Sequence, residues 1–215
     1  MKVLIGQPIH EMGITQLENE ICRNKGIDII LYPEGYLSDG EALENACKLA
    51  RKNSIMIITS YRKDNKDWAV IINQYGERIL ERAKTPPEEK VELYPPLSVS
   101  SPQIEIGYIL CMEILKGVRD LKKVTKNMNI VTHPIGVGMF SDEQYEQWLG
   151  EAKKIAKAYN TMVIGTSHAD GSYKNCGISI PISYCIDCNG EAIYASKSDT
   201  RTRIVDLDSK EVKVI

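Results

Sequence analysis

Short apolar runs of strand length alternate with segments of helical periodicity along most of the chain. Residues 3–7 and 27–32 are compact apolar runs, and between them Ile14, Leu17 and Ile21 recur at helical spacing. The run at 27–32 is almost wholly apolar, as expected of a strand that is buried on both faces. This alternation predicts an α/β fold.

The alternation continues to the end of the chain and predicts about eleven strands and four helices, more than one open sheet accommodates. Capping boxes at 38–41 and 141–144 mark the starts of two helices, and the turns at 74–76 and 189–190 predict hairpins. No linker or repeat divides the sequence, so we expect a single domain over 1–215 with two packed sheets. The expected strands are residues 3–7, 27–32, 55–59, 68–73, 77–82, 103–110, 129–132, 162–165, 178–186, 191–195 and 201–207.

Composition and charge exclude several classes of partner. The 215 residues include 29 acidic and 27 basic side chains, giving a net charge of -2. This balance argues against a strongly basic nucleic-acid binder and gives no electrostatic reason to expect an anionic membrane as partner. No apolar run reaches the roughly 18 residues of a membrane span, and the apolar start is too short for a signal peptide. We therefore expect a cytoplasmic protein with no nucleic-acid or membrane partner.

In that reducing compartment most of the six cysteines are expected to be buried, unreactive thiols rather than disulfides. Cys185 and Cys188 form a CxxC pair inside the predicted hairpin, but no second Cys or His pair stands at metal-ligand spacing. Their separation of three residues points the two side chains to opposite faces of a strand. A redox role would require them to form a reversible disulfide, and we expect neither that nor a metal.

Three reactive side chains stand at the ends of predicted strands. Glu34, Lys84 and Cys111 each come directly before a loop or a helix. Ligands bind at the carboxyl ends of strands in α/β sheets, so these residues form a candidate site. A carboxylate is able to take the thiol proton, and a lysine is able to stabilise the oxyanion that acyl transfer creates.

The order of three local sequences resembles the nitrilase superfamily of carbon–nitrogen hydrolases. An apolar strand ends in Pro33-Glu34, a hairpin leads to Lys84, and a later strand ends in Cys111-Met112-Glu113. Residues 3–7 and 176–191 are similar to the family's first strand and its closing strand and hairpin, so the resemblance covers nearly the whole chain. It implies a four-layer α-β-β-α sandwich of two mixed sheets.

The resemblance also implies a mechanism without a cofactor. Cys111 would attack a non-peptide carbon–nitrogen bond of a small molecule and form a thioester, with Glu34 as general base and acid. Lys84 and the backbone N–H of Met112 would stabilise the oxyanion. An amide is the leading substrate class, with a nitrile or a carbamoyl group as alternatives. The family also implies a homodimer or higher homo-oligomer.

Two further site residues are expected. Members of the family carry a second glutamate shortly after the lysine, which positions that lysine, and Glu92 occupies the matching place, with Glu88 and Glu89 as alternatives. His133 follows a buried strand and is expected to line the substrate pocket. Packing or loop placement of His133 is the competing interpretation.

Departures from the family pattern leave two other functions open. Met112 replaces the usual aromatic residue after the nucleophile, residues 114–117 replace the usual continuation, and the chain lacks the longer tail that many members use for dimer contact. The same thioester would serve an acyl transferase. A non-catalytic binding or regulatory protein on this scaffold is the other alternative.

Overall fold

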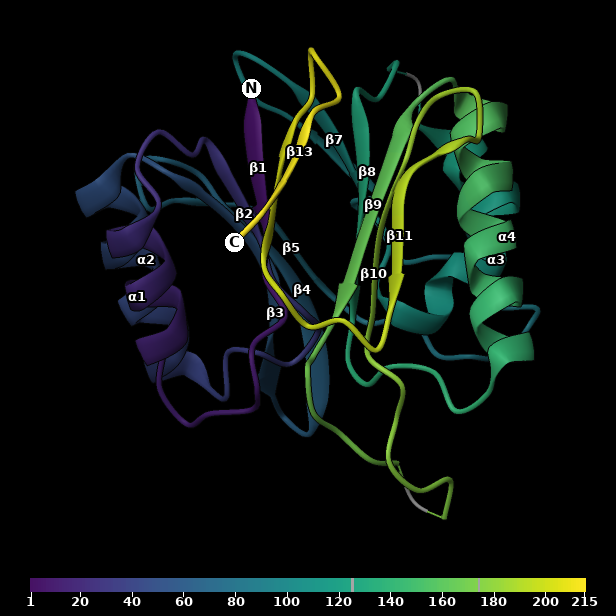
Figure 1. Cartoon of the computed structure of the whole chain (residues 1–215), viewed down its shortest axis with the longest axis horizontal. Coiled ribbons are helices and arrows are strands. Elements are labelled where there is room, and N and C mark those ends of the chain that lie inside the picture. The colour runs from purple at the N-terminus through teal and green to yellow at the C-terminus, as the bar shows by residue number, and fades with distance from the viewer. Residues whose placement is uncertain (125, 174) are drawn as a thin grey trace.

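The computed structural model describes residues 1–124, 126–173 and 175–215. Two sheets pack face to face, and helices cover their outer faces (Figure 1). The helices α1 and α2 lie against the first sheet, and α3 and α4 lie against the second, which gives the four layers expected from the sequence.

The elements follow one another in two similar halves. The first half contains β1 (Lys2–Ile5), α1 (Thr15–Arg23), β2 (Ile29–Leu31), α2 (Gly40–Asn53), β3 (Met56–Lys63), β4 (Lys66–Ile72) and β5 (Arg78–Ala83). The second half contains β6 (Ser98–Ser100), β7 (Glu105–Tyr108), the 3-10 turn η1 (Cys111–Glu113), α3 (Ile114–Asp120), the 3-10 turn η2 (Leu121–Lys123), β8 (Ile130–Ile135), α4 (Asp142–Tyr159), β9 (Met162–Ser167), β10 (Ile182–Ile186), β11 (Ala192–Lys197), β12 (Arg203–Asp206) and β13 (Val212–Val214).

Both sheets are mixed, as expected. The seven-stranded sheet has the order β13-β12-β1-β2-β3-β4-β5, and the six-stranded sheet has the order β11-β10-β9-β8-β7-β6. At the centre of each sheet three strands run parallel, β1–β2–β3 in one and β7–β8–β9 in the other, with antiparallel strands on either side. Parallel neighbours need crossover helices, and α1 to α4 supply them. The carboxyl ends of the central strands therefore meet at one edge of each sheet.

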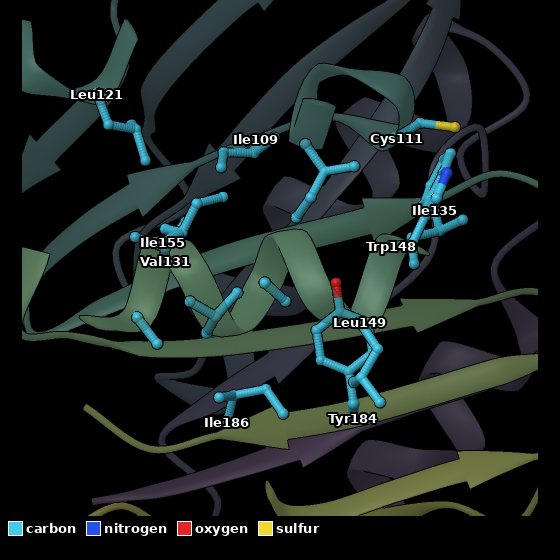
Figure 2. Packing of buried hydrophobic residues seen from close by; sticks show 14 of the residues in the cluster. Ile109, Cys111, Leu121, Val131, Ile135, Trp148, Leu149, Ile155, Tyr184 and Ile186 are labelled. Atoms are coloured by element: carbon cyan, nitrogen blue, oxygen red, sulfur yellow. The ribbon is translucent and has the colours of Figure 1, made fainter. Parts of the chain in front are cut away.

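The central strands are buried on both faces, which explains their continuous apolar sequence. In β2, Ile30 packs among the side chains of α1 and α2, whereas Ile29 and Leu31 face the core between the sheets. A third cluster fills the space between the second sheet and α3 and α4 (Figure 2). Burying each of these aliphatic side chains stabilises the fold by roughly 1.5–3 kcal/mol.

The two helix starts predicted from capping boxes, those of α2 and α4, agree with the structure to within one residue. Ser141 caps α4 by accepting a hydrogen bond from the backbone N–H of Gln144 at 3.2 Å. The cap of α2 is Asp39 rather than Ser38, and it accepts from the Ala42 N–H at 2.9 Å. The Ser38 hydroxyl instead donates to the carbonyl of Met12 in the β1–α1 loop at 2.7 Å. Each cap contributes on the order of 1 kcal/mol.

Several strand boundaries differ from the expectation. β3 continues to Lys63, beyond residue 59, and turns through Asp64 and Asn65, which both adopt positive φ, into β4. The closing strand begins at Ile182 instead of residue 178. β6 and β13 were not expected, because these short edge strands carry polar or alternating sequence without an apolar run.

Candidate active site

The turn after β2 carries Glu34 into the interior. The Thr59 hydroxyl donates to the carbonyl of Pro33 at 2.7 Å, and the backbone N–H of Glu34 donates to the carbonyl of Ile135 at 3.3 Å. Gly35 follows with a φ of +72°, a left-handed conformation that favours glycine. The middle of β3 and the end of β8 thus fix the backbone of the turn from which the buried Glu34 side chain extends.

Lys84 reaches Glu34 from the end of β5. Its backbone N–H donates to the carbonyl of Asp67 at 2.8 Å, which continues the antiparallel register of β4 and β5 by one residue. From this position the Lys84 Nζ lies 2.7 Å from Glu34 Oε1. The ammonium and the carboxylate therefore form a close ion pair between hairpin and strand.

Cys111 is the first residue of η1, shortly after the end of β7, and its backbone is strained. Its φ is +52°, a left-handed conformation that is costly for a residue with a side chain. Its carbonyl accepts a hydrogen bond from the His133 Nε2 at 2.8 Å. The Glu34 carboxylate raises the pKa of the Cys111 thiol, and the backbone N–H of Gly136 lowers it, so both groups act directly on the sulfur. Cys111 therefore joins Glu34 and Lys84 in one cluster.

Gly136 is required by this close packing. A Cβ atom at Gly136 would lie 2.7 Å from Glu34 Oε2, closer than real Cβ contacts come. The absence of a side chain lets the β8–α4 loop approach both the carboxylate and the thiol. Gly136 was not expected from the sequence, because no periodicity or turn signal distinguishes it from other loop glycines.

Burial and neighbouring charge set the protonation of the cluster. Burial raises the pKa of Cys111 to about 12, with the Glu34 charge adding to the rise and the Lys84 charge opposing it. Burial also raises the pKa of Glu34, and Lys84 only partly offsets this. Burial by itself lowers the pKa of Lys84, but the negative charge of Glu34, and that of Cys111 once its thiol is ionised, outweigh it and raise the pKa overall. The resting cysteine is thus a thiol beside a carboxylate that is able to accept its proton.

Asp67 is the second carboxylate near this cluster. It lines the same cavity, pairs with Arg62 at 3.1 Å, and its charge raises the pKa of Glu34. Asp67 was not expected from the sequence. The β4–β5 register, in which Trp68 pairs with Ala83, places Asp67 opposite Lys84 and would have been the signal.

Glu92 lies outside the cluster, contrary to the expectation that it positions Lys84. Its side chain is 65% exposed and forms an ion pair with Lys123. The loop after β5 folds toward η2, so this carboxylate faces solvent and a separate surface cavity. Glu88 and Glu89 are exposed on the same loop and do not line the cavity of Cys111 either.

His133 lies behind the nucleophile, not on the cavity wall as expected. Its side chain is fully buried, and burial lowers its pKa to about 4, so the ring is neutral. Its Nε2–H donates to the Cys111 carbonyl, and its Nδ1 accepts from the Tyr184 hydroxyl. His133 therefore supports the strained Cys111 backbone from the core. This agrees with the competing interpretation of the sequence, in which His133 has a packing role.

Neither the one cluster of potential metal ligands among the described residues nor the cysteines outside the cavity add a second reactive site. Among the described residues, His10, His168 and Asp170 have potential metal-ligand atoms within 4.8 Å of one another. The ring nitrogens of His168, however, face the carbonyls of Pro8 at 3.2 Å and Glu34 at 3.1 Å, so neither is left for a metal. All six cysteines are free thiols.

The three clustered residues open onto one cavity of about 870 Å³. Glu34, Lys84 and Cys111 all line it. Figure 2 shows Cys111 at one end of the α3–α4 cluster, on the same side as Trp148 and Ile135. The nucleophile candidate thus lies at the boundary between the apolar core and the cavity.

Comparison with known proteins shows the fold. No family model matches the chain, and no curated protein matches it by sequence. The structure is similar to a variant of an amidase of the nitrilase superfamily from Nesterenkonia, at a TM-score of 0.78 and 16% identity, over 98% of this chain and 92% of that one. A carbon–nitrogen hydrolase from Helicobacter pylori is similar at a TM-score of 0.74 and 15% identity, over 98% of this chain and 90% of that one.

A third structure is a glutamate-to-glutamine variant of the Nesterenkonia amidase with acrylamide added at its active-site cysteine. It matches at a TM-score of 0.74 and 14% identity, over 98% of this chain and 94% of that one. The chain therefore has the fold of nitrilase-superfamily carbon–nitrogen hydrolases, as the sequence resemblance implied. Within the described residues, no helix is long and apolar enough to span a membrane.

Proposed function

We propose that this protein is a cysteine hydrolase that cleaves the carbon–nitrogen bond of a small-molecule amide. The observation that carries the proposal is the convergence of three side chains on one cavity. Lys84 Nζ lies 2.7 Å from Glu34 Oε1, and Cys111, whose thiol pKa is raised by the same carboxylate, lines the same cavity. Base, cation and nucleophile are within direct reach of one another, as thiol acyl transfer requires.

In the first half-reaction Glu34 takes the Sγ proton of Cys111 as the sulfur attacks the amide carbon. The negative charge moves to the amide oxygen, where Lys84 Nζ and the backbone N–H of Met112 stabilise it. The tetrahedral intermediate collapses, Glu34 returns the proton to the departing nitrogen, and the acyl group remains on the sulfur as a thioester.

In the second half-reaction Glu34 takes a proton from water, and the hydroxide attacks the thioester carbon. Collapse releases the carboxylic acid and returns the proton to the sulfur. A carboxylate whose pKa is raised by burial suits both roles, because it holds a proton more readily than an exposed carboxylate and is still able to release it.

The fold supports this proposal independently of the site. The similar Nesterenkonia enzyme is an amidase, and acrylamide adds to its active-site cysteine in one variant. At 14–16% identity this likeness concerns the fold, so the roles proposed for Glu34, Lys84 and Cys111 rest on their own geometry. Amides are proposed ahead of nitriles because the matched amidase is similar over nearly the whole chain.

A screen of primary amides for ammonia release tests the proposal. We expect wild type to hydrolyse at least one amide and Cys111→Ala to lose all turnover while remaining folded by circular dichroism. Cys47→Ala is the matched control, because Cys47 is a similarly buried thiol on α2, away from the cavity. Turnover by Cys111→Ala equal to wild type would contradict the assignment, and hydroxamate formation with hydroxylamine would reveal acyl transfer.

A further inference from the structure

The cavity above Cys111 has two chemically different walls. The wall contributed by the first half of the chain is polar and includes Glu34, Arg62, Asp67 and Lys84. The wall contributed by the second half is mainly apolar. Its apolar side chains are Met112, Val137, Met139, Phe140 and Trp148, and Gln144, Tyr173 and Cys176 line the cavity beside them.

Four of the charged side chains on the polar wall compensate one another in pairs, and Glu11, which also lines the cavity, accepts hydrogen bonds from the Tyr36 hydroxyl and the Gln16 N–H. Arg62 pairs with Asp67 at 3.1 Å, and Lys84 pairs with Glu34 at 2.7 Å. A charged group on a substrate would have to compete with these pairs and lose part of its hydration. The apolar wall carries no such cost for an apolar group.

Chemistry dictates which part of a substrate faces which wall. The leaving nitrogen must be within reach of Glu34, because that carboxylate protonates it, so the leaving group faces the polar wall. The acyl group stays bonded to Cys111 after the nitrogen departs. Its substituent must point away from Glu34 and Lys84, toward the side on which Trp148 lies near Cys111 (Figure 2).

The apolar wall is held in place before any ligand binds. Met139 and Ile180 exchange two backbone hydrogen bonds, at 2.9 and 2.6 Å, which tie the β8–α4 loop to the β9–β10 loop. The backbone N–H of Phe140 donates to the Gln144 side chain on α4 at 2.8 Å. Because the wall is fixed, apolar contact with it costs little ordering of the protein.

Cavity size argues against a two-carbon acyl group. The volume of about 870 Å³ is in the range of pockets that enclose drug-sized ligands. We propose that the apolar wall is an acyl-binding subsite and that the substrates are primary amides of uncharged apolar acids, such as medium-chain aliphatic or arylacetic acids. This inference rests on the proposed function and names the substrate class of the same site.

The test is a series of primary amides of increasing chain length. Each methylene buried against the wall is expected to raise kcat/KM about fourfold, so hexanamide should exceed acetamide by about 200-fold. Succinamate, which carries a carboxylate on the acyl group, should not exceed acetamide. Phe140→Ser should reduce the ratio of hexanamide to acetamide at least fivefold. Tyr75→Ser is the control, because Tyr75 is an exposed aromatic residue outside the cavity.

Binding to the Cys111→Ala variant separates the two claims. If no amide is hydrolysed but hexanamide binds this variant more tightly than acetamide does, the hydrolase proposal fails and the subsite stands. If acetamide is hydrolysed as well as hexanamide, the hydrolase proposal stands and the apolar subsite is overturned. If wild type shows no turnover and the variant shows no preference in calorimetry, both are overturned.

Discussion

Arg82 and Glu113 form a doubly hydrogen-bonded ion pair in which both side chains are only 2% exposed. Arg82 stands two residues before Lys84, and Glu113 stands two residues after Cys111. The Glu113 carboxylate also accepts the backbone N–H of Leu110 at 2.8 Å. The pair therefore joins the strand that presents the lysine to the turn that presents the nucleophile.

Replacing one member of this pair should destabilise the protein strongly. Glu113→Gln leaves the buried guanidinium of Arg82 uncompensated, and we expect a loss of about 3–5 kcal/mol in the free energy of unfolding, measured with urea. Glu151→Gln removes an exposed ion pair with Lys154 and should cost less than about 1 kcal/mol. Equal losses in the two variants would show that the buried pair does not hold the site together.

The stability contributed by this pair should depend on pH in a definite direction. Burial by itself raises the pKa of Glu113, but the hydrogen bonds from Arg82 and the backbone outweigh it and lower the pKa below 4.5. A lowered folded pKa contributes stability above the unfolded value, and this contribution is lost as the pH falls through the folded value. The stability gap between wild type and Glu113→Gln should therefore narrow on acidification below pH 4.5.

Glu34→Gln should separate thiol reactivity from catalysis. The Glu34 charge raises the pKa of Cys111, whereas the Lys84 charge lowers it, so removing the carboxylate leaves the lowering influence. We expect Cys111 to react with iodoacetamide at pH 7.5 at least tenfold faster in the variant, while amide turnover disappears with the proton acceptor. The exposed thiol of Cys22, which lies outside the cavity, serves as the internal reference in the mass spectrum. Slower labelling of Cys111 would contradict this electrostatic account.

Gly136→Ala tests how closely the loop must approach the carboxylate. The new Cβ would lie 2.7 Å from Glu34 Oε2, so either the loop or the carboxylate must move. A displacement of about 1 Å is expected to lower kcat/KM on the order of 100-fold. Gly150→Ala is the control, because a Cβ there meets nothing within 4 Å. A fully active Gly136→Ala variant would show that the site tolerates the displacement.

Substitution of Asp67 should change the pH dependence of kcat/KM, whereas substitution of Glu92 should leave activity nearly unchanged. The Asp67 charge raises the pKa of Glu34, so Asp67→Asn should lower that pKa and move the acidic limb of the kcat/KM profile to lower pH. Glu92→Gln loses only an exposed ion pair with Lys123, and its activity should stay within about twofold of wild type. If Glu92→Gln shifts the pH profile of kcat/KM and Asp67→Asn does not, Glu92 positions Lys84 as the sequence alone predicts.

The sequence predicted those site residues that stand at the ends of continuous apolar strands. Buried central strands need apolar side chains on both faces. The end of the apolar run in β2 therefore marks the end of the strand, and Glu34 follows directly after it. Asp67 and Gly136 depend on hairpin register and on a loop path, and neither leaves a periodic signal. Family spacing alone distinguishes Glu92 from the other glutamates of its loop, and the path of the folded loop places it on a different cavity from Cys111. The single-domain boundary at 1–215 stays a prediction.

The central claim is that an acyl group becomes bonded to the Cys111 sulfur during turnover. Rapid quenching of wild type with hexanamide, followed by peptide mass spectrometry, measures this directly. We predict a hexanoyl adduct on the peptide that contains Cys111, formed within the first turnover. Hydroxylamine should remove this adduct, as expected of a thioester. The Cys111→Ser variant should show no thioester. If wild type releases ammonia from hexanamide but carries no adduct on Cys111, or carries the adduct on another residue, the account is contradicted.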